Sequence, residues 1–201
     1  MKSRLRYLAL VAVGALAFTA CGSPNSQPTD PPTTAASQPA SSNPLEKAGL
    51  ASLSGEQLIE KLDQLPIAER STDFVASIRL DHILVTDLAT KTESEVPLNG
   101  DEYYLSVAPY VTQTHPCFFH SLTTCLGEQR NTPMELTVTE VATGEKVIDE
   151  SVTTYDNGFY GFWLPKGKDY EVTFTANGKT GTQIFTTNDD FGTCATELQL
   201  A

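Results

Sequence analysis

The apolar residues that follow position 54 recur with a helical period. They mark one face at Leu58, Ile59, Leu62 and Leu65. This spacing predicts a short amphipathic helix. Residues 54–57 have the form of a capping box, with Ser54 before the first turn, and Pro66 ends the helix. The carboxylates of the segment, Asp63 included, are predicted to lie on its solvated face.

From position 74 the apolar residues alternate with polar ones, which is the period of a half-buried strand. The alternation over 74–81 predicts one strand, and His82 continues its inward parity as a core residue. Polar residues 90–95 are expected between strands, and Asn99-Gly100 is a turn signal. Further strands are predicted at 103–108, 134–141, 146–154, 159–164, 170–176, 179–186 and 193–200.

Short strands separated by turn signals at intervals of about ten residues are typical of all-β architectures. We therefore predict a mainly β fold with a short N-terminal helical element (α+β). The strands should form an antiparallel β-sandwich or a barrel-like sheet. Within 170–176, the side chains of Tyr170, Val172 and Phe174 are expected to face the core.

The N-terminus has the pattern of a bacterial lipoprotein signal. Three basic residues precede an apolar run at 7–20, which is too short for a comfortable membrane span. Small residues stand just before Cys21. We expect residues 1–20 to be removed and Cys21 to be lipidated, so that the chain is anchored at the outer face of the cytoplasmic membrane, in the periplasm or cell envelope. Simple cleavage that leaves a free Cys21 is the alternative.

Composition divides the rest of the chain. Residues 22–44 hold 6 prolines and no aromatic residue, so we predict that 21–44 is a lipidated, disordered tether. The remainder, 45–201, is long enough for one domain with a real core. We expect a helical preface at 45–71 and a β-rich part at 72–201.

The chain is acidic, with a formal net charge of −12. Removal of the signal would leave 10 Lys and Arg against 25 Asp and Glu. Such a surface repels phosphate backbones and anionic lipid headgroups, which argues against nucleic-acid binding. It suits a secreted protein that meets cations, although solubility alone explains it equally well.

Two of the 4 cysteines and two of the 3 histidines fall within residues 114–128. They are His115, Cys117, His120 and Cys125. Another thiol, Cys194, lies near the C-terminus. If Cys21 is lipidated, an odd number of thiols remains in a compartment where thiols are usually oxidised, and this needs an explanation. Sulfur and imidazole together suit a thiophilic metal.

Spacing alone leaves two interpretations open. In the structural one, Cys117 and Cys125 close a disulfide loop and Cys194 is a buried, inert thiol. In the functional one, the loop supplies two thiolates and the last strand a third, which suits Cu(I). The separation of Cys117 and Cys125 is not a standard metal spacing and is compatible with a disulfide.

Three motifs of the chain also resemble one known family. They are His115-Pro116-Cys117 with His120-Ser121-Leu122-Thr123-Thr124-Cys125 and Gly127-Glu128, then Phe162-Trp163-Leu164-Pro165, then Thr193-Cys194-Ala195-Thr196 with Gln199-Leu200. In this order they resemble the CueP family of extracytoplasmic copper-binding proteins, with a departure at Glu197 and Leu198. The matches cover most of the chain after about Val107.

The resemblance implies that Cys117, Cys125 and Cys194 are copper-binding thiols. It also implies a role in copper resistance, in which Cu(I) is sequestered and handed to secreted cuproproteins such as a Cu,Zn superoxide dismutase. Related proteins raise the prospect of a homodimer, although no stretch of this chain demands one. Zinc is the runner-up metal, because a site of three cysteines and one histidine satisfies its tetrahedral preference.

The neighbours of the cysteines suggest further roles. His120 could supply a fourth ligand or hydrogen-bond a sulfur, whereas His115 is assigned mainly to loop geometry, with a weak copper contact as the alternative. Thr123 and Thr124 could offer hydroxyls to the thiolates. Glu128 is expected to face solvent.

Enzyme motifs are missing from the sequence. A thiol oxidoreductase would have Cys-x-x-Cys, and a serine hydrolase of the elbow type Gly-x-Ser-x-Gly. We predict no enzyme, apart from a stoichiometric reduction of Cu(II) in which Cys117 and Cys125 are oxidised. The competing class is a surface-anchored β-sandwich that acts as a binding or adhesion module and whose cysteines are structural.

Overall fold

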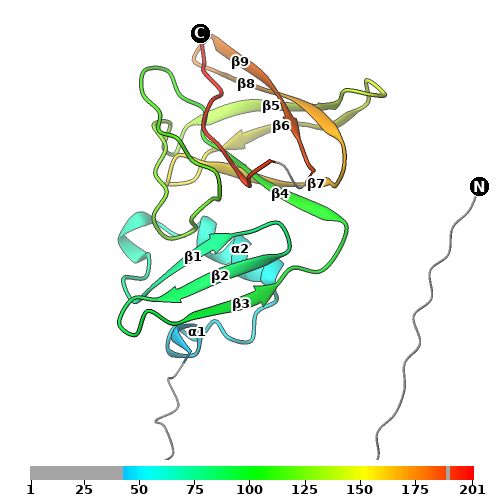
Figure 1. The fold of residues 1–201 in the computed structure, drawn as a ribbon. Coiled ribbons are helices and arrows are strands. Elements are labelled where there is room, and N and C mark those ends of the chain that lie inside the picture. Colours follow the sequence, from blue (N-terminus) through cyan, green and yellow to red (C-terminus); the bar gives the residue numbers. More distant parts are fainter. Residues whose placement is uncertain (1–42, 189–190) are drawn as a thin grey trace, which may run out of the picture. The chain divides into compact units, whose positions relative to one another are not determined.

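The computed structural model describes residues 43–188 and 191–201 (Figure 1). The signal and lipidation predictions, and the tether prediction up to residue 42, fall outside these residues, whereas the last predicted tether residue, Pro44, already belongs to a helix. Within this described part, no helix is long and apolar enough to span a membrane. The domain begins with the short helix α1 (Pro44–Lys47).

The predicted amphipathic helix is α2 (Gly55–Asp63), followed by the single 3₁₀ turn η1 (Ile67–Glu69). The capping box of α2 is confirmed, because Gln57 N donates to Ser54 Oγ at 3.3 Å and Ser54 N donates to Gln57 Oε1 at 3.0 Å. This reciprocal pair satisfies two backbone donors at the first turn. The start of the helix is therefore fixed locally by its own sequence.

A small antiparallel sheet, in the order β1-β2-β3, packs against α2. It consists of β1 (Phe74–Ile78), β2 (His82–Asp87) and β3 (Glu93–Pro97). The strand predicted over 74–81 is confirmed over 74–78 as β1 but ends there, because the chain turns where Arg79 N donates to His82 O at 2.8 Å. That turn resets the parity, so His82 is half-buried beside Asp81 and does not join the core.

The polar stretch at 90–95, predicted to separate strands, instead runs into β3, one of the two edge strands of this sheet. Its residues alternate between exposed and half-buried, with none fully buried. The stretch becomes a strand because it pairs with β2; Val96, for example, lies opposite Ile83. An edge strand of this kind needs little apolar sequence, because only one of its sides is hydrogen-bonded and charged residues protect the other.

Two further sheets enclose the main core. One has the order β10-β4-β7, from β4 (Glu102–Val107), β7 (Tyr160–Pro165) and β10 (Cys194–Ala195). The other has the order β6-β5-β8-β9, from β5 (Pro133–Glu140), β6 (Lys146–Thr153), β8 (Asp169–Ala176) and β9 (Lys179–Thr186). The predicted mainly β class and antiparallel sheets are confirmed, and the sheets do not close into a barrel. The closing strand, expected over 193–200, has only the two residues of β10 and runs parallel to β4.

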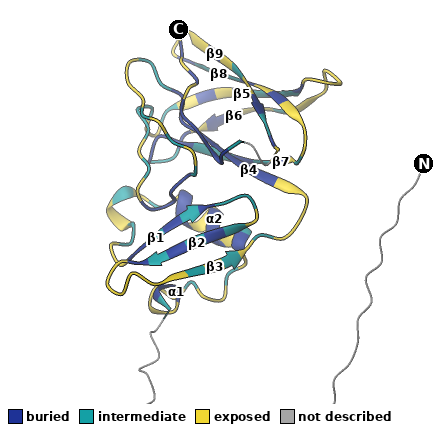
Figure 2. Ribbon diagram, in the orientation of Figure 1, coloured by how far each residue is buried: buried dark blue, intermediate teal, exposed yellow. Residues whose placement is uncertain are grey.

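Strand β4 is buried on both faces and joins the two hydrophobic cores (Figure 2). Leu105 and Val107 belong to the main core, between the sheet of β4 and the sheet of β5, together with Tyr170, Val172 and Phe174, as predicted for β8. Tyr104 points the other way, into the core formed by α2 and the small sheet. Because side chains alternate along a strand, one segment serves both cores.

Candidate metal centre

The chain from 114 to 128 lies between β4 and β5 and is tied to two strands that are distant in sequence. Ile78 N of β1 donates to His120 O at 2.8 Å, and Cys194 N of β10 donates to Phe118 O at 3.1 Å. Buried backbone groups that are paired in this way hold a segment in place without regular structure. The loop at 114–128 is therefore held in one position next to β10.

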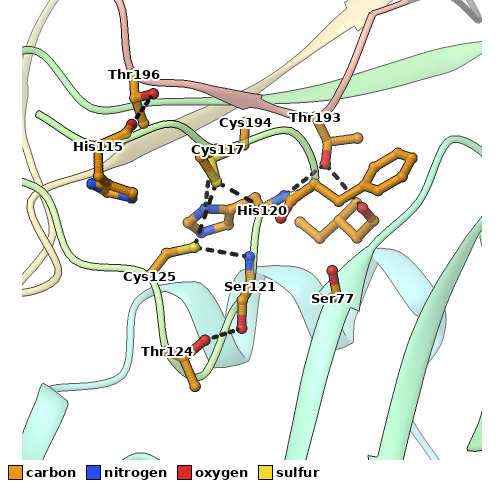
Figure 3. Close-up of a disulfide and its surroundings, with 12 residues drawn as sticks. Ser77, His115, Cys117, His120, Ser121, Thr124, Cys125, Thr193, Cys194 and Thr196 are labelled. Atoms are coloured by element: carbon orange, nitrogen blue, oxygen red, sulfur yellow. Dashed lines mark hydrogen bonds between the residues drawn. A yellow bond between two sulfur atoms is a disulfide. The ribbon is translucent and has the colours of Figure 1, made fainter.

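The sulfur atoms of Cys117, Cys125 and Cys194 lie close together where this loop meets β10 (Figure 3). Cys117 and Cys194 form a disulfide whose Cα atoms are 5.6 Å apart. Cys125 is a free thiol, and its Sγ lies 3.7 Å from Cys117 Sγ. The closing strand thus brings its sulfur to the pair in the loop.

The disulfide expected in the structural interpretation, between Cys117 and Cys125, is wrong. The hydrogen bond from Cys194 N to Phe118 O places Cys194 next to Cys117, and Cys125 is the cysteine left free. Cys194 is buried, as that interpretation required, but it is bonded and not an inert thiol.

The Cys125 thiol lies in an environment that favours its thiolate. Ser121 N donates to Cys125 Sγ at 3.2 Å, and Arg70 Nη1 donates to the carbonyl oxygen of Cys125 at 2.9 Å. Burial raises the pKa of Cys125, but the hydrogen bond and positive charge of His120 outweigh burial, and the net pKa is lowered. A thiolate is the form of cysteine that binds metals.

The threonine hydroxyls do not take the role predicted for them. Thr123 Oγ1 accepts from Ala76 N at 3.3 Å, and Thr124 Oγ1 donates to Ser121 Oγ at 2.6 Å. The bond of the buried Thr123 ties the turn that carries Cys125 to β1, whereas Thr124 is exposed. Besides His120, one donor to the Cys125 sulfur is the backbone N–H of Ser121, which the side-chain sequence could not reveal.

His120 is fully buried at the inner side of the sulfur cluster. Its Nδ1 lies 3.9 Å from Cys194 Sγ, and its Nε2 lies 2.9 Å from Asp63 Oδ1. The ring packs on Phe159, with centroids 4.5 Å apart. Burial would lower the pKa of His120, but the Asp63 carboxylate outweighs it and raises the pKa to about 9.

The prediction that Asp63 lies on a solvated face is wrong, because its side chain is 0% exposed. Tyr104 OH donates to its Oδ2 and Asn157 Nδ2 to its Oδ1, each at 2.8 Å. Burial raises the pKa of Asp63, but the charge of His120 leads the opposing effects and the net pKa is lowered. The sequence did carry one signal of this burial: Asp63 follows Ile59 by four residues and so lies on the apolar face of the helix.

His115 lies at the outer side of the cluster and is half-buried. One ring nitrogen of His115, Cys117 Sγ and Cys125 Sγ lie within 4.8 Å of one another. A second set, one ring nitrogen of His120 with the sulfurs of Cys125 and Cys194, meets the same limit. The two sets share Cys125, so each histidine lies near a different pair of sulfurs that includes Cys125.

A surface cavity of about 310 Å³ opens beside His115, and Glu128 also lines it. Glu128, which was predicted to face solvent, is partly exposed, and its carboxylate also accepts from Val111 N at 2.5 Å and from Thr112 N at 3.0 Å. A hydrogen bond from the Thr112 hydroxyl is the main cause that lowers the pKa of Glu128 to about 2. Glu128 therefore fixes the chain next to the sulfur cluster.

Taken together, the fold and this cluster define a β-rich protein with a cysteine–histidine centre that could hold a thiophilic metal. The family model described as periplasmic copper-binding protein CueP matches residues 57–199. The chain belongs to the CueP family.

One solved structure supports this assignment in three dimensions. The crystal structure of S.CueP is similar with a TM-score of 0.72 and 38% sequence identity, over 78% of this chain and 94% of that chain. No curated protein sequence matches the chain. The family resemblance seen in the cysteine motifs is thus confirmed over most of the domain.

Proposed function

We propose that this protein is an extracytoplasmic copper-binding protein that holds Cu(I) between the thiolates of Cys117, Cys125 and Cys194. The observation that carries this proposal is the meeting of all three sulfurs, two of them bonded and the third 3.7 Å from Cys117 Sγ. Three soft thiolates suit a monovalent copper ion. Membership of a family described as copper-binding supports the same choice.

Copper binding by three thiolates requires that the disulfide is first reduced. Two molecules of a thiol reductant would supply two electrons and two protons, giving Cys117 and Cys194 as thiols and one oxidised reductant. The thiols then lose protons as Cu(I) binds. In the oxidised protein Cys125 is the one free thiol among the described residues, so its affinity for Cu(I) should be much lower.

The test is an anaerobic titration of the reduced protein against a competing Cu(I) chelator. Cys194→Ser should weaken Cu(I) binding strongly. Thr124→Ala is the matched control, because this exposed hydroxyl bonds Ser121 and no sulfur, and it should leave the affinity unchanged. An affinity that is equal in Cys194→Ser and in the parent protein would contradict three-thiolate binding. A parallel Zn²⁺ titration tests zinc as the competing metal.

Transfer and anchoring complete the proposal. The signal pattern before Cys21 favours lipidation at that residue. The family resemblance favours a protein that passes Cu(I) by ligand exchange to an acceptor such as a Cu,Zn superoxide dismutase. The half-buried His115, beside an open cavity, leaves the cluster accessible from one side. Labelling with a fatty acid should be lost in Cys21→Ala, and copper transfer to an apo acceptor should be measurable by its recovered activity.

The disulfide between Cys117 and Cys194 also favours a second candidate, a surface-anchored binding or adhesion module with structural cysteines. That candidate predicts that the reduced protein gains no copper affinity over the oxidised one. The same disulfide would be the product of a stoichiometric reduction of Cu(II), in which two thiolates give one electron each to two Cu(II) ions. Thiol counting before and after addition of Cu(II) separates these outcomes.

A further inference from the structure

We propose that Asp63 is a positioning residue for the metal centre. It holds His120 through the N–H of Nε2, so that Nδ1 is the nitrogen presented to the sulfurs. This inference rests on the proposed copper-binding function and adds to it a residue from α2, which is far from Cys194 in sequence. Nothing in the cysteine motifs points to this residue.

The partners of Asp63 show that Nε2 of His120 carries a proton. Tyr104 OH donates to Oδ2, and the amide Nδ2 of Asn157 donates to Oδ1. A carboxylate that receives both donors acts as an acceptor. The contact of 2.9 Å to His120 Nε2 must then be a hydrogen bond donated by Nε2. Nδ1 is left as the nitrogen that lies 3.9 Å from Cys194 Sγ.

The carboxylate is itself held rigidly, and so is the ring that it holds. Asn157 Nδ2 also donates to the backbone carbonyl of Asp63 at 3.2 Å, while Asn157 Oδ1 accepts from Phe159 N at 2.8 Å. The Phe159 ring packs on His120, and His120 N donates to Thr193 Oγ1 at 3.0 Å. The backbone, the ring face and Nε2 of His120 are therefore all fixed.

A charge buried this deeply is costly unless its partners compensate for the lost water. An apolar residue at position 63 would pack against the same core without that cost. A carboxylate does what an apolar residue cannot, because a hydrogen bond to the distal nitrogen orients a metal-binding or sulfur-contacting imidazole and raises its basicity. Loss of such a partner typically lowers metal affinity by roughly 10–100-fold.

The decisive comparison uses the reduced full-length protein with Asp63→Asn and, as its matched control, Tyr104→Phe. Both variants remove a hydrogen bond at the same buried carboxylate, but only Asp63→Asn changes the partner of His120. Competition with a Cu(I) chelator should give an affinity about 10–100-fold lower for Asp63→Asn. Tyr104→Phe should stay close to the parent protein. Equal affinities for the two variants would overturn the proposal.

A spectroscopic measurement keeps the proposal testable even if Asp63→Asn folds poorly. Nitrogen-15 NMR of the His120 ring in the parent protein should show Nε2 protonated both with and without Cu(I), and Nδ1 alone should change on Cu(I) binding. A Cu(I)-loaded protein in which Nε2 lacks the proton would overturn the proposal. In Asp63→Asn the amide can donate to Nε2, and the proton should then move to Nδ1.

Failure of the proposed function gives a different pattern from failure of this inference. If the reduced parent protein does not bind Cu(I), or if Cys194→Ser binds it equally well, both proposals fall. If Cys194→Ser loses binding but Asp63→Asn binds as tightly as Tyr104→Phe, only the role of Asp63 is wrong.

Discussion

The sandwich core and the metal centre are built in opposite ways. The sandwich core is the main core between the sheet of β4 and the sheet of β5, and it comes from alternating apolar residues on hairpins, such as Val172 and Phe174 on β8. The centre draws Asp63, Cys125 and Cys194 from three elements and holds them with hydrogen bonds and one disulfide. The volume of buried apolar side chains should therefore decide the stability of the core. Hydrogen-bond and charge partners should decide the metal affinity and thiol reactivity of the centre.

The largest expected effect lies in the sandwich and leaves the centre intact. Phe174→Ala removes a fully buried ring and should lower the free energy of unfolding by about 3–5 kcal/mol. Glu171→Ala, an exposed change on the same strand, should stay within about 0.5 kcal/mol. Chemical denaturation measures both changes. A loss of Cu(I) affinity in folded Phe174→Ala would show that the two regions are not independent.

Loss of the disulfide should come next in size. Cys117 and Cys194 are 77 residues apart in sequence, and removal of a native disulfide typically costs about 2–5 kcal/mol. We expect the free energy of unfolding of Cys194→Ser to be lower than that of the oxidised parent by about this amount. Under reducing conditions the difference should largely disappear. Cys125→Ser, which breaks no disulfide, is the control and should unfold like the parent. Equal stability of all three oxidised proteins would contradict a structural contribution from the bond.

Stability of the centre should also depend on pH through His120. Its folded pKa of about 9 lies above its ordinary value of 6.5. The stabilisation by Asp63 is therefore complete below about pH 6.5 and is lost as the pH rises through about 9. Denaturation of the parent between these pH values should show a falling free energy of unfolding. In His120→Gln this decline should be absent, and an unchanged pH profile would contradict the ion pair.

The smallest effect concerns the reactivity of Cys125 in the oxidised protein. Because the pKa of this thiol is lowered mainly by His120, alkylation by iodoacetamide should begin at a lower pH than for an ordinary thiol near pH 8.5. His120→Gln should shift the pH profile upward. Thr124→Ala should leave it in place. A profile that His120→Gln does not move would remove the electrostatic link between the two residues.

The sandwich could be predicted from the sequence because its pattern is local. Alternation located β8 and β9 with their bounds nearly correct, and the capping box located the start of α2. The small sheet was harder, because a turn at Arg79 reset the alternation and β3 is formed by pairing with β2. Edge pairing leaves little apolar signal in the chain itself.

The centre could be predicted only in its cysteines and histidines, which stand out by residue type. Their pairing could not, because it depends on the contact of β10 with the loop at Phe118. Asp63 was assigned to solvent because a carboxylate on a helix is usually exposed. Its burial follows from Tyr104 and Asn157, which approach from remote strands and loops.

X-ray absorption spectroscopy of the reduced protein loaded with one equivalent of Cu(I) tests the central claim most directly. It counts the sulfur atoms bound to copper. Binding by Cys117, Cys125 and Cys194 predicts three sulfur neighbours in the parent protein and two in Cys194→Ser. A parent spectrum with a single sulfur neighbour, or one that Cys194→Ser does not alter, would contradict a centre in which the three cysteines act together.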